Sequence, residues 1–369
     1  MSTNHKLTPK KLQETISQIR KGEFPYKTKE QKKVDFTKYN IAQINEIADV
    51  LETIRNIVDQ AYQRLQDSNI IKKGPGRPSI PIKDVVKVAL MESYFGVSDR
   101  VSEGFLRLFR EKLGVSSNFS YKTIERGYDP ERSKELLDEI LKITNELGNS
   151  KEKKFSIDGT GDPCSTKVNY ESKRAQQRKD KEDKTSNMHT DAFPGKKRDF
   201  QYSVFSIGTT TKVIGGFATT DDHSKGELSF FKEVVEETID NCPRFDTLCG
   251  DGIYASRVAC ALLEEAAITP FFMPRSNVTF RSRGVRSWMS MLISLTENPQ
   301  QWLEAYHDRS ISETGNSMLK RRESTKIRKK LSARKATQAA LKFMVHNIRQ
   351  ICYLRYLAPK LLRHNIVED

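Results

Sequence analysis

The chain has 369 residues, of which 36% are hydrophobic and 30% charged, and its formal net charge is +15 at pH 7. This length allows two or three domains with apolar cores, and the basic balance is typical of a protein that binds a polyanion, most often nucleic acid, with a basic surface kept for solubility as the alternative. No apolar run reaches the ~18 residues that span a membrane, no signal segment opens the chain, and the 5 cysteines lack metal-ligand spacing, so we expect a cytoplasmic protein with reduced, buried thiols.

The N-terminal part is predicted to be helical. Residues 1–40 are polar and Lys-rich with little periodicity, which predicts a flexible basic arm. From residue 41 on, apolar residues recur in steps of three and four, which predicts a helix with one apolar side. This seam either packs inside its own domain or forms a dimer contact. Its members are Ile44, Ile47, Leu51, Ile54, Val58, Ala61 and Leu65.

A basic linker rich in glycine and proline follows at 68–82. Its Arg77 could enter the minor groove of DNA, as short arginine-bearing arms do, or belong only to a linker. The stretch 113–127 has the pattern of a helix–turn–helix, although many helical hairpins share it. We therefore predict a helical DNA-binding and dimerisation region over 41–150. Its further helices are expected over 83–96, 99–113 and 130–147.

Residues 151–358 have the pattern of an α/β domain, followed by a tail at 359–369. Three strands are followed by alternating helices and strands, which is the order of a ribonuclease-H-like fold, a mixed sheet flanked by helices. The charged stretch at about 160–200 is too polar to fold alone and predicts a mobile insertion near the active site. The strands are expected over 154–158, 201–208, 212–219, 246–250 and 270–273, and the helices over 227–240, 255–267, 286–296, 300–324 and 334–356.

Three acidic residues are candidate metal ligands. Asp158 and Asp251 each end an expected strand beside glycine, and Glu313 lies on an expected helix. Cleavage of a phosphodiester by two divalent ions requires carboxylates that converge from separate elements, and small neighbours let metal and phosphate approach the backbone. For each aspartate alone, an ordinary turn beside glycine is the alternative. Weaker candidates are Asp162, Asp221, Asp222 and Asp246.

Glu313 shares a stripe with Tyr306, Arg309 and Lys320. On a continuous helix over 300–324 the four residues fall within roughly 60° of arc. Arg309 and Lys320 can then neutralise phosphates next to the scissile one, and Tyr306 offers a hydroxyl donor and a flat ring. The alternative is a solvated helix face with an ion pair between Arg309 and Glu313.

A basic run extends this stripe. Between residues 320 and 335 there are nine Lys and Arg residues against one acid, which is more than an ion-paired helix face requires. We therefore predict that Arg321 and Arg322 bind DNA together with Lys320. Trp302 also falls on the stripe, where it either stacks on a displaced base or, as we prefer, packs in the core.

The spacing Tyr306-x2-Arg309-x3-Glu313-x6-Lys320 resembles the Y-(2)-R-(3)-E-(6)-K signature of a prokaryotic family of DDE transposases, insertion-sequence family four. Asp158 in SIDGTG resembles the first acid of that family, Asp251 in CGDGIYAS the second, and the stretch VHNIRQ at 345–350 its last helix. The resemblance covers about 150–355.

This resemblance implies a ribonuclease-H-like catalytic core in which Asp158, Asp251 and Glu313 hold two Mg²⁺ ions, with Mn²⁺ as a substitute and no other cofactor. It also implies that Tyr306, Arg309 and Lys320 hold terminal DNA. Many relatives carry a large β-rich insertion between the second acid and the glutamate, whereas only 61 residues separate Asp251 from Glu313 here. The chain is thus closer to related families with shorter cores.

We expect a transposase that binds the terminal inverted repeats of an insertion sequence and catalyses metal-dependent cleavage and strand transfer. Because an element has two ends, we expect a homodimer on double-stranded DNA, associated with the nucleoid in a prokaryotic cytoplasm. One alternative is a stand-alone metal-dependent nuclease, which would cut without joining. The other is a DNA-binding protein that descends from a transposase and has lost the chemistry.

Overall fold

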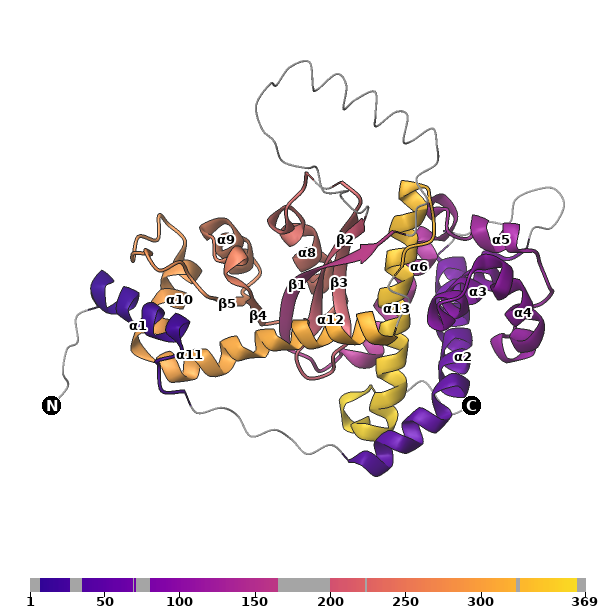
Figure 1. Cartoon of the computed structure of the whole chain (residues 1–369), viewed down its shortest axis with the longest axis horizontal. Helices are drawn as coiled ribbons and strands as arrows, with labels where there is room; N and C mark the ends of the chain where they lie inside the picture. The colour runs from indigo at the N-terminus through magenta and orange to yellow at the C-terminus, as the bar shows by residue number, and fades with distance from the viewer. Residues whose placement is uncertain are drawn as a thin grey trace, which may run out of the picture.

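A computed structural model of the chain describes residues 7–26, 35–68, 70, 80–164, 200–222, 224–322 and 326–363. The body is elongated, with a β-sheet near its middle, helices α2 to α6 (within residues 36–148) grouped at one end and α1 (Pro9–Lys21) at the other (Figure 1). The predicted DNA-binding residue Arg77 and most of the predicted insertion at 160–200 lie outside the described residues. No helix among the residues described is both long and apolar enough to cross a lipid bilayer.

The helices α2 to α6 at one end of the body share one apolar core. α3 and α4 each end on a glycine in the left-handed conformation, Gly96 at φ 61° and Gly114 at φ 59°, which closes the last turn. The core also receives one side of the C-terminal helix α13, through residues such as Leu341 and Ile348. The elements are α2 (Phe36–Asp67), α3 (Ile82–Phe95), α4 (Asp99–Leu113), α5 (Tyr121–Arg126), α6 (Pro130–Gly148) and α13 (Ser332–Leu357).

The predicted apolar seam of α2 divides into two parts. From Leu51 to Leu65 its residues are buried in this helical core, so packing inside the domain is the correct alternative for them. The first two members are on the surface, with Ile44 82% and Ile47 51% exposed. Only this end of the seam is available to a partner.

The predicted flexible arm is wrong for residues 9–21, which form helix α1 (Pro9–Lys21). Thr8 caps its N-terminus and Gly22, at φ 71°, closes its C-terminus. Leu12 and Ile16, one turn apart, are fully buried in the core around the sheet and not in the helical core. These two apolar positions are enough to dock the helix but too few to produce a clear periodic pattern.

The sheet has five strands in the order β3-β2-β1-β4-β5. β1 pairs antiparallel with β2, and β2 with β3, whereas β1, β4 and β5 are parallel. The predicted mixed sheet flanked by helices is therefore confirmed. The strands are β1 (Lys154–Pro163), β2 (Phe200–Gly208), β3 (Ile214–Thr220), β4 (Thr247–Gly250) and β5 (Thr269–Phe272).

Helices cover both faces of the sheet (Figure 1). On one face Val234 of α8 packs with Phe155 and Val204, and on the other Leu319 of α12 and Phe343 of α13 pack with Phe205. The elements after β3 are η1 (Glu227–Phe230), α8 (Phe231–Asn241), η2 (Gly252–Tyr254), α9 (Arg257–Glu265), α10 (Arg286–Glu297), α11 (Pro299–Tyr306), η3 (His307–Arg309), α12 (Ser310–Arg322) and η4 (Pro359–Leu361).

Helix α12 lies close against the sheet at Gly315. A Cβ atom added there would stand 2.6 Å from Cδ1 of Ile207, so the approach requires glycine. The contact fixes the height of α12 above β1 and β2 and thereby places the turn that carries Glu313. α13 then joins sheet and helical core, because its two sides pack against different layers.

Candidate active site

Asp158 and Asp251 lie at the same end of two neighbouring strands, as predicted. β1 and β4 pair in parallel as far as Ile157 opposite Gly250, and the two acids are the next residue on each strand. The prediction that Asp158 ends its strand is wrong, however. β1 continues to Pro163 because its antiparallel pairing with β2 continues, so Asp158 lies where only the parallel partner stops.

The Asp158 carboxylate is held from two directions. The backbone N–H of Gly159 donates to its Oδ1 at 2.9 Å, and Nδ2 of Asn316 donates to its Oδ2 at 3.0 Å. Burial raises the pKa of Asp158, the Gly159 N–H lowers it, and the charges of Glu227, Asp251 and Glu313 raise it further. These four carboxylates therefore share one region at the end of the sheet.

The helix predicted over 300–324 is interrupted. α11 ends at Tyr306, a 3₁₀ turn follows, and α12 starts at Ser310. The hydroxyl of Ser310 donates to the carbonyl of His307 at 2.9 Å and that of Ser312 donates to the carbonyl of Arg309 at 2.7 Å. Both bonds reach the carbonyl three residues back, and such bonds accompany the tighter turn. The 60° stripe computed for one straight helix therefore does not apply, although α11 and α12 follow one continuous path across the sheet (Figure 1).

Tyr306 is buried, with only 9% of its surface exposed. Its ring stacks on Trp302 with 5.0 Å between centroids, and the guanidinium of Arg309 lies 5.7 Å from its ring centre. Trp302 is 1% exposed, which confirms the preferred interpretation of this tryptophan as a core residue. The Tyr306 ring thus packs against the Arg309 guanidinium in this structure, and it is too buried for a base to stack on it.

Arg309 connects this stack to Glu313. Its Nη1 lies 3.1 Å from Oε1 of Glu313, with the two side chains 35% and 57% exposed. The ion pair is the one expected for a solvated helix face, and at this exposure it contributes little to stability. It turns the Glu313 carboxylate toward a cation of the preceding 3₁₀ turn and leaves both side chains accessible.

The predicted DNA-binding cations at the end of α12 differ in their surroundings. Lys320 and Arg321 are exposed. Arg322 instead donates to the hydroxyl of Tyr39 at 3.0 Å and lies 4.9 Å from the ring centre of Tyr353, so it joins α12 to α2 and α13. Arg322 thus has contacts within the protein, and its binding to DNA stays a prediction.

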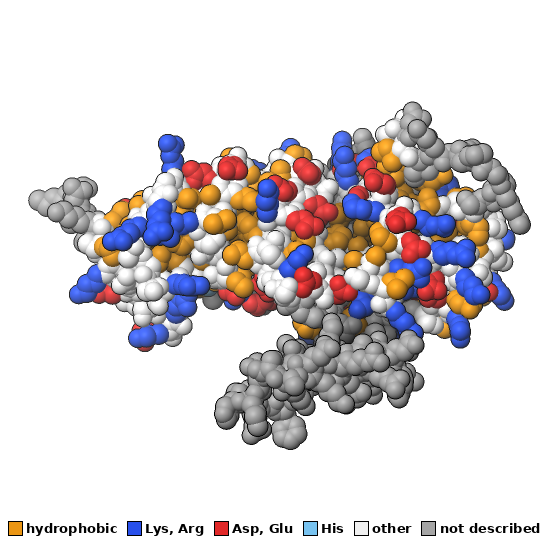
Figure 2. Space-filling model, turned by 90° about the horizontal axis from the view of Figure 1, so that it is seen from above, with side chains coloured by type: hydrophobic (Ala, Val, Ile, Leu, Met, Phe, Trp, Pro, Cys, Tyr) orange, Lys and Arg blue, Asp and Glu red, His pale blue; other side chains and the backbone are white. Residues whose placement is uncertain are grey.

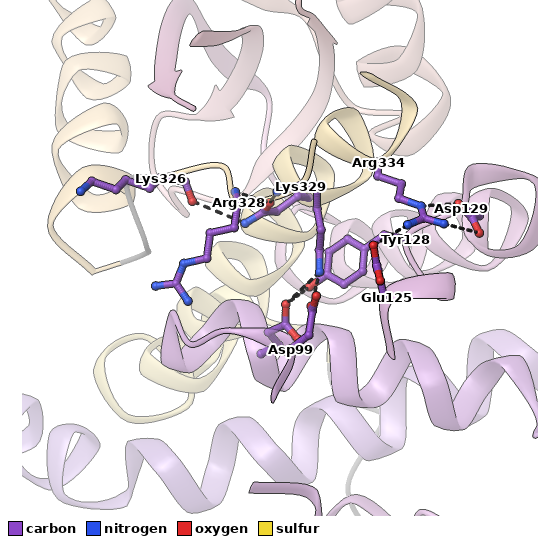
Figure 3. A network of polar contacts seen from close by, with 10 residues as sticks. Asp99, Glu125, Tyr128, Asp129, Lys326, Arg328, Lys329 and Arg334 are labelled. Atoms are coloured by element: carbon purple, nitrogen blue, oxygen red, sulfur yellow. Dashed lines mark hydrogen bonds and ion pairs between the residues drawn. The ribbon is translucent and has the colours of Figure 1, made fainter. Parts of the chain in front are cut away.

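Much of the basic run beyond α12 is also paired within the protein (Figure 3). Lys329 is buried, 3.3 Å from the Glu92 carboxylate, also paired with Asp99 and 3.7 Å from the ring centre of Tyr128. Arg334 pairs with Asp129 at 2.6 Å and with Glu125 at 2.7 Å. These cations tie the α12–α13 segment to the N-terminal helices. The surface is accordingly of mixed sign, with acidic and basic side chains interspersed along the face in Figure 2.

The donor set around Asp158 suits a hard divalent cation. Carboxylate and amide oxygens are the ligands that Mg²⁺ prefers, and Oδ1 of Asn316 is buried without a hydrogen-bond partner. Within the described part of the chain, however, no group of three or more His, Cys, Asp or Glu side chains is close enough to hold an ion as it stands. The predicted convergence of Asp158, Asp251 and Glu313 is thus not met in this conformation, in which Arg309 holds Glu313.

Two residues of this region were missed by the sequence analysis. Asn316 follows Glu313 by three positions, so helical spacing could have placed it on the same face. Glu227 opens η1, and no spacing in the sequence relates it to the other acids.

Comparison with known proteins links the chain to mobile DNA. It is 26% identical to a probable transposase for the insertion sequence element ISA1214 of Archaeoglobus fulgidus, over 339 residues that make up 91% of each chain. No protein-family model matches the chain. The similarity extends through both the helical end and the sheet, so it supports transposase function in general.

Proposed function

We propose that this protein is a DDE transposase that binds the terminal inverted repeats of an insertion sequence and cuts and joins DNA with divalent metal ions. The observation that carries the proposal is the placement of Asp158 and Asp251 at one end of neighbouring parallel strands, under the helix that carries Glu313. The near full-length similarity to a probable insertion-sequence transposase supports it independently.

The sheet supports a ribonuclease-H-like core. Three antiparallel strands are followed by two parallel ones, and the sheet order β3-β2-β1-β4-β5 places β1 in the centre. In such a core the first acid lies on the central strand and the second just beyond its parallel neighbour, which are the positions of Asp158 and Asp251. The Y-R-E-K spacing then supplies Glu313 from the helix that crosses this end.

Asp158, Asp251 and Glu313 would hold two Mg²⁺ ions, or Mn²⁺ in their place. When bound, the ions activate water or a 3′-hydroxyl and stabilise the leaving oxygen of an in-line displacement. The protein's own side chains would orient the metal ligands and neutralise the charge of the phosphate. Asn316 fixes the Asp158 carboxylate, and Arg309, supported by Tyr306, can move from Glu313 to a phosphate.

DNA contacts of the proposed enzyme include the exposed Lys320 and Arg321 and the helical region 41–150, which would bind the element ends. The two ends of an element call for two active sites, so the proposed active form is a homodimer on DNA. Such an enzyme would work on the nucleoid of a prokaryotic cell.

A strand-transfer assay with the cloned ends of the encoding element and Mg²⁺ tests the proposal. Wild-type protein should give joined products that depend on the end sequences. Asp251→Asn should abolish cleavage and leave gel-shift affinity unchanged, because this acid would hold metal and not phosphate. Asp246→Asn is the matched control. Asp246 lies just before the first residue of β4, at the end opposite Asp251, and pairs with Lys153 at 3.9 Å.

Three outcomes would contradict the proposal. Cleavage without joining and without preference for the ends would indicate a stand-alone nuclease. End binding without any cleavage by the wild type would indicate a DNA-binding protein of transposase descent. Equal activity of the Asp251→Asn and Asp246→Asn variants would remove Asp251 from the active site.

A further inference from the structure

Glu227 is one of two inward-facing residues of the turn η1, the other being Phe230. It opens η1, and residues 224–226 before it and 228–229 after it are exposed, whereas Glu227 itself is half-buried. Its Oε2 accepts a hydrogen bond from the hydroxyl of Tyr254 at 3.3 Å. A partly buried carboxylate loses part of its hydration, so it needs a hydrogen-bond donor or a cation that compensates for this loss.

The glycine that follows Asp158 makes room for Glu227. A Cβ atom added at Gly159 would stand 2.5 Å from Oε1 of Glu227 and 2.2 Å from the hydroxyl of Tyr202. The carboxylate therefore lies directly against the β1 backbone, one residue beyond Asp158. A side chain at position 159 would displace the ends of the Glu227 and Tyr202 side chains from where they lie.

The two hydroxyls connect Glu227 with the surroundings of both aspartates. Tyr202 comes from β2 beside β1 and is bonded to Glu227, and burial together with this contact raises the pKa of its hydroxyl. Tyr254 ends η2, the turn whose N-terminus Asp251 caps through the N–H of Gly252. Glu227 is thus fixed between the strand of Asp158 and the turn of Asp251.

We propose that Glu227 is a fourth carboxylate of the active site, which binds divalent metal together with Asp158 and is oriented by the hydroxyls of Tyr202 and Tyr254. The inference rests on the proposed function. Two observations support it besides the neighbouring acids. The first is the space that Gly159 leaves beside its strand. The second is the side chain of Asn316, whose Nδ2 holds Asp158 while its buried Oδ1 has no hydrogen-bond partner. The first lets the Glu227 carboxylate lie against the strand next to Asp158, and the second is a buried acceptor of the kind that a divalent cation binds.

The test uses the Glu227→Gln variant of the full chain. Gln keeps the shape and can still accept the hydroxyl of Tyr254, but it removes the charge that a cation requires. Mn²⁺ binding without DNA, measured by paramagnetic resonance, should weaken about 10-fold, and the Mg²⁺ concentration for half-maximal cleavage should rise in proportion. DNA affinity in gel shifts should stay unchanged. Glu236→Gln, on the exposed side of α8 where Glu236 pairs with Lys232, is the matched control.

Unchanged Mn²⁺ binding by the Glu227→Gln variant, when Asp158→Asn abolishes it, would overturn the inference and leave the proposed function intact. Unchanged binding and cleavage in both variants would overturn the proposed function itself. If the Glu227→Gln variant does not fold, the Glu227→Asp variant replaces it in the test. Asp keeps the negative charge on a side chain that is shorter by one methylene group. That variant should bind Mn²⁺ more weakly than the wild type, and equal affinity would again refute a metal-binding role.

Discussion

Lys329 belongs to the basic run but forms its ion pairs inside the protein. Its side chain is 4% exposed, 3.3 Å from Oε1 of Glu92, and paired as well with Asp99 (Figure 3). Lys329→Met would keep the volume and leave these carboxylates without their counter-ion. Removal of one partner from a buried ion pair typically costs about 3–5 kcal/mol.

The expected loss depends on pH. Burial raises the pKa of Glu92 to about 7, and the charge of Lys329 opposes that shift. Without Lys329, the Glu92 carboxyl can remain protonated and so avoid part of the free-energy cost of a buried, unpaired charge. Keeping it protonated costs more free energy as the pH rises. Lys329→Met should therefore lower the free energy of unfolding by about 3 kcal/mol at pH 8 and by less at pH 5.

Urea unfolding of five proteins checks this prediction, namely the wild type, the Lys329→Met, Lys330→Met and Glu92→Gln variants, and the double variant of Lys329 and Glu92. Lys330→Met, at the exposed neighbouring position, should change stability by less than about 0.5 kcal/mol. Combined with Glu92→Gln, Lys329→Met should cost clearly less than it does alone, because one of the two acids no longer needs a counter-ion. Equal stability of the Lys329→Met and Lys330→Met variants, with DNA affinity lost only in the former, would refute the reasoning and place Lys329 at the DNA surface.

Local patterns predicted the elements of the sheet well. The expected strands lie within two residues of those observed, except that β1 continues for five residues past Asp158. Its apolar run stops at Ile157, and the small residues that follow gave no strand signal. What extends the strand is pairing with β2, a contact between distant segments that no local pattern contains.

The sequence allowed us to predict which residues belong to the candidate site, but not the conformation of the helical segment that carries Glu313. The parallel pairing that joins Asp158 and Asp251 follows from strand order, so their proximity could be foreseen. The break in the helix at 307–309 could not, because the apolar pattern continues on both sides of it. Net charge was misleading in the same way, since composition counts cations without their partners and Arg334 finds its acids more than 200 positions away in the sequence.

Three further predictions concern salt, pH and assembly. Substitution of both Lys320 and Arg321 by Ala should lower the slope of log affinity for DNA against log salt by about 2, and an unchanged slope would place both cations away from phosphate. Burial raises the pKa of Glu237 from 4.5 to about 7, so its contribution to stability is present below the lower value and lost as the pH rises to the upper one. Glu237→Gln should accordingly raise the free energy of unfolding by roughly 2 kcal/mol at pH 8 and hardly change it at pH 4, as urea titration would show. The last prediction concerns Ile44 and Ile47, which are 82% and 51% exposed at the free end of α2. Because both side chains already face solvent, their replacement by Asp should leave the melting temperature unchanged, whereas a second protein copy on paired DNA ends would have to bury two charges. Light scattering should then show fewer complexes with two protein copies while single-end gel shifts stay the same, and an unaltered two-copy complex would exclude this end of α2 from the dimer contact.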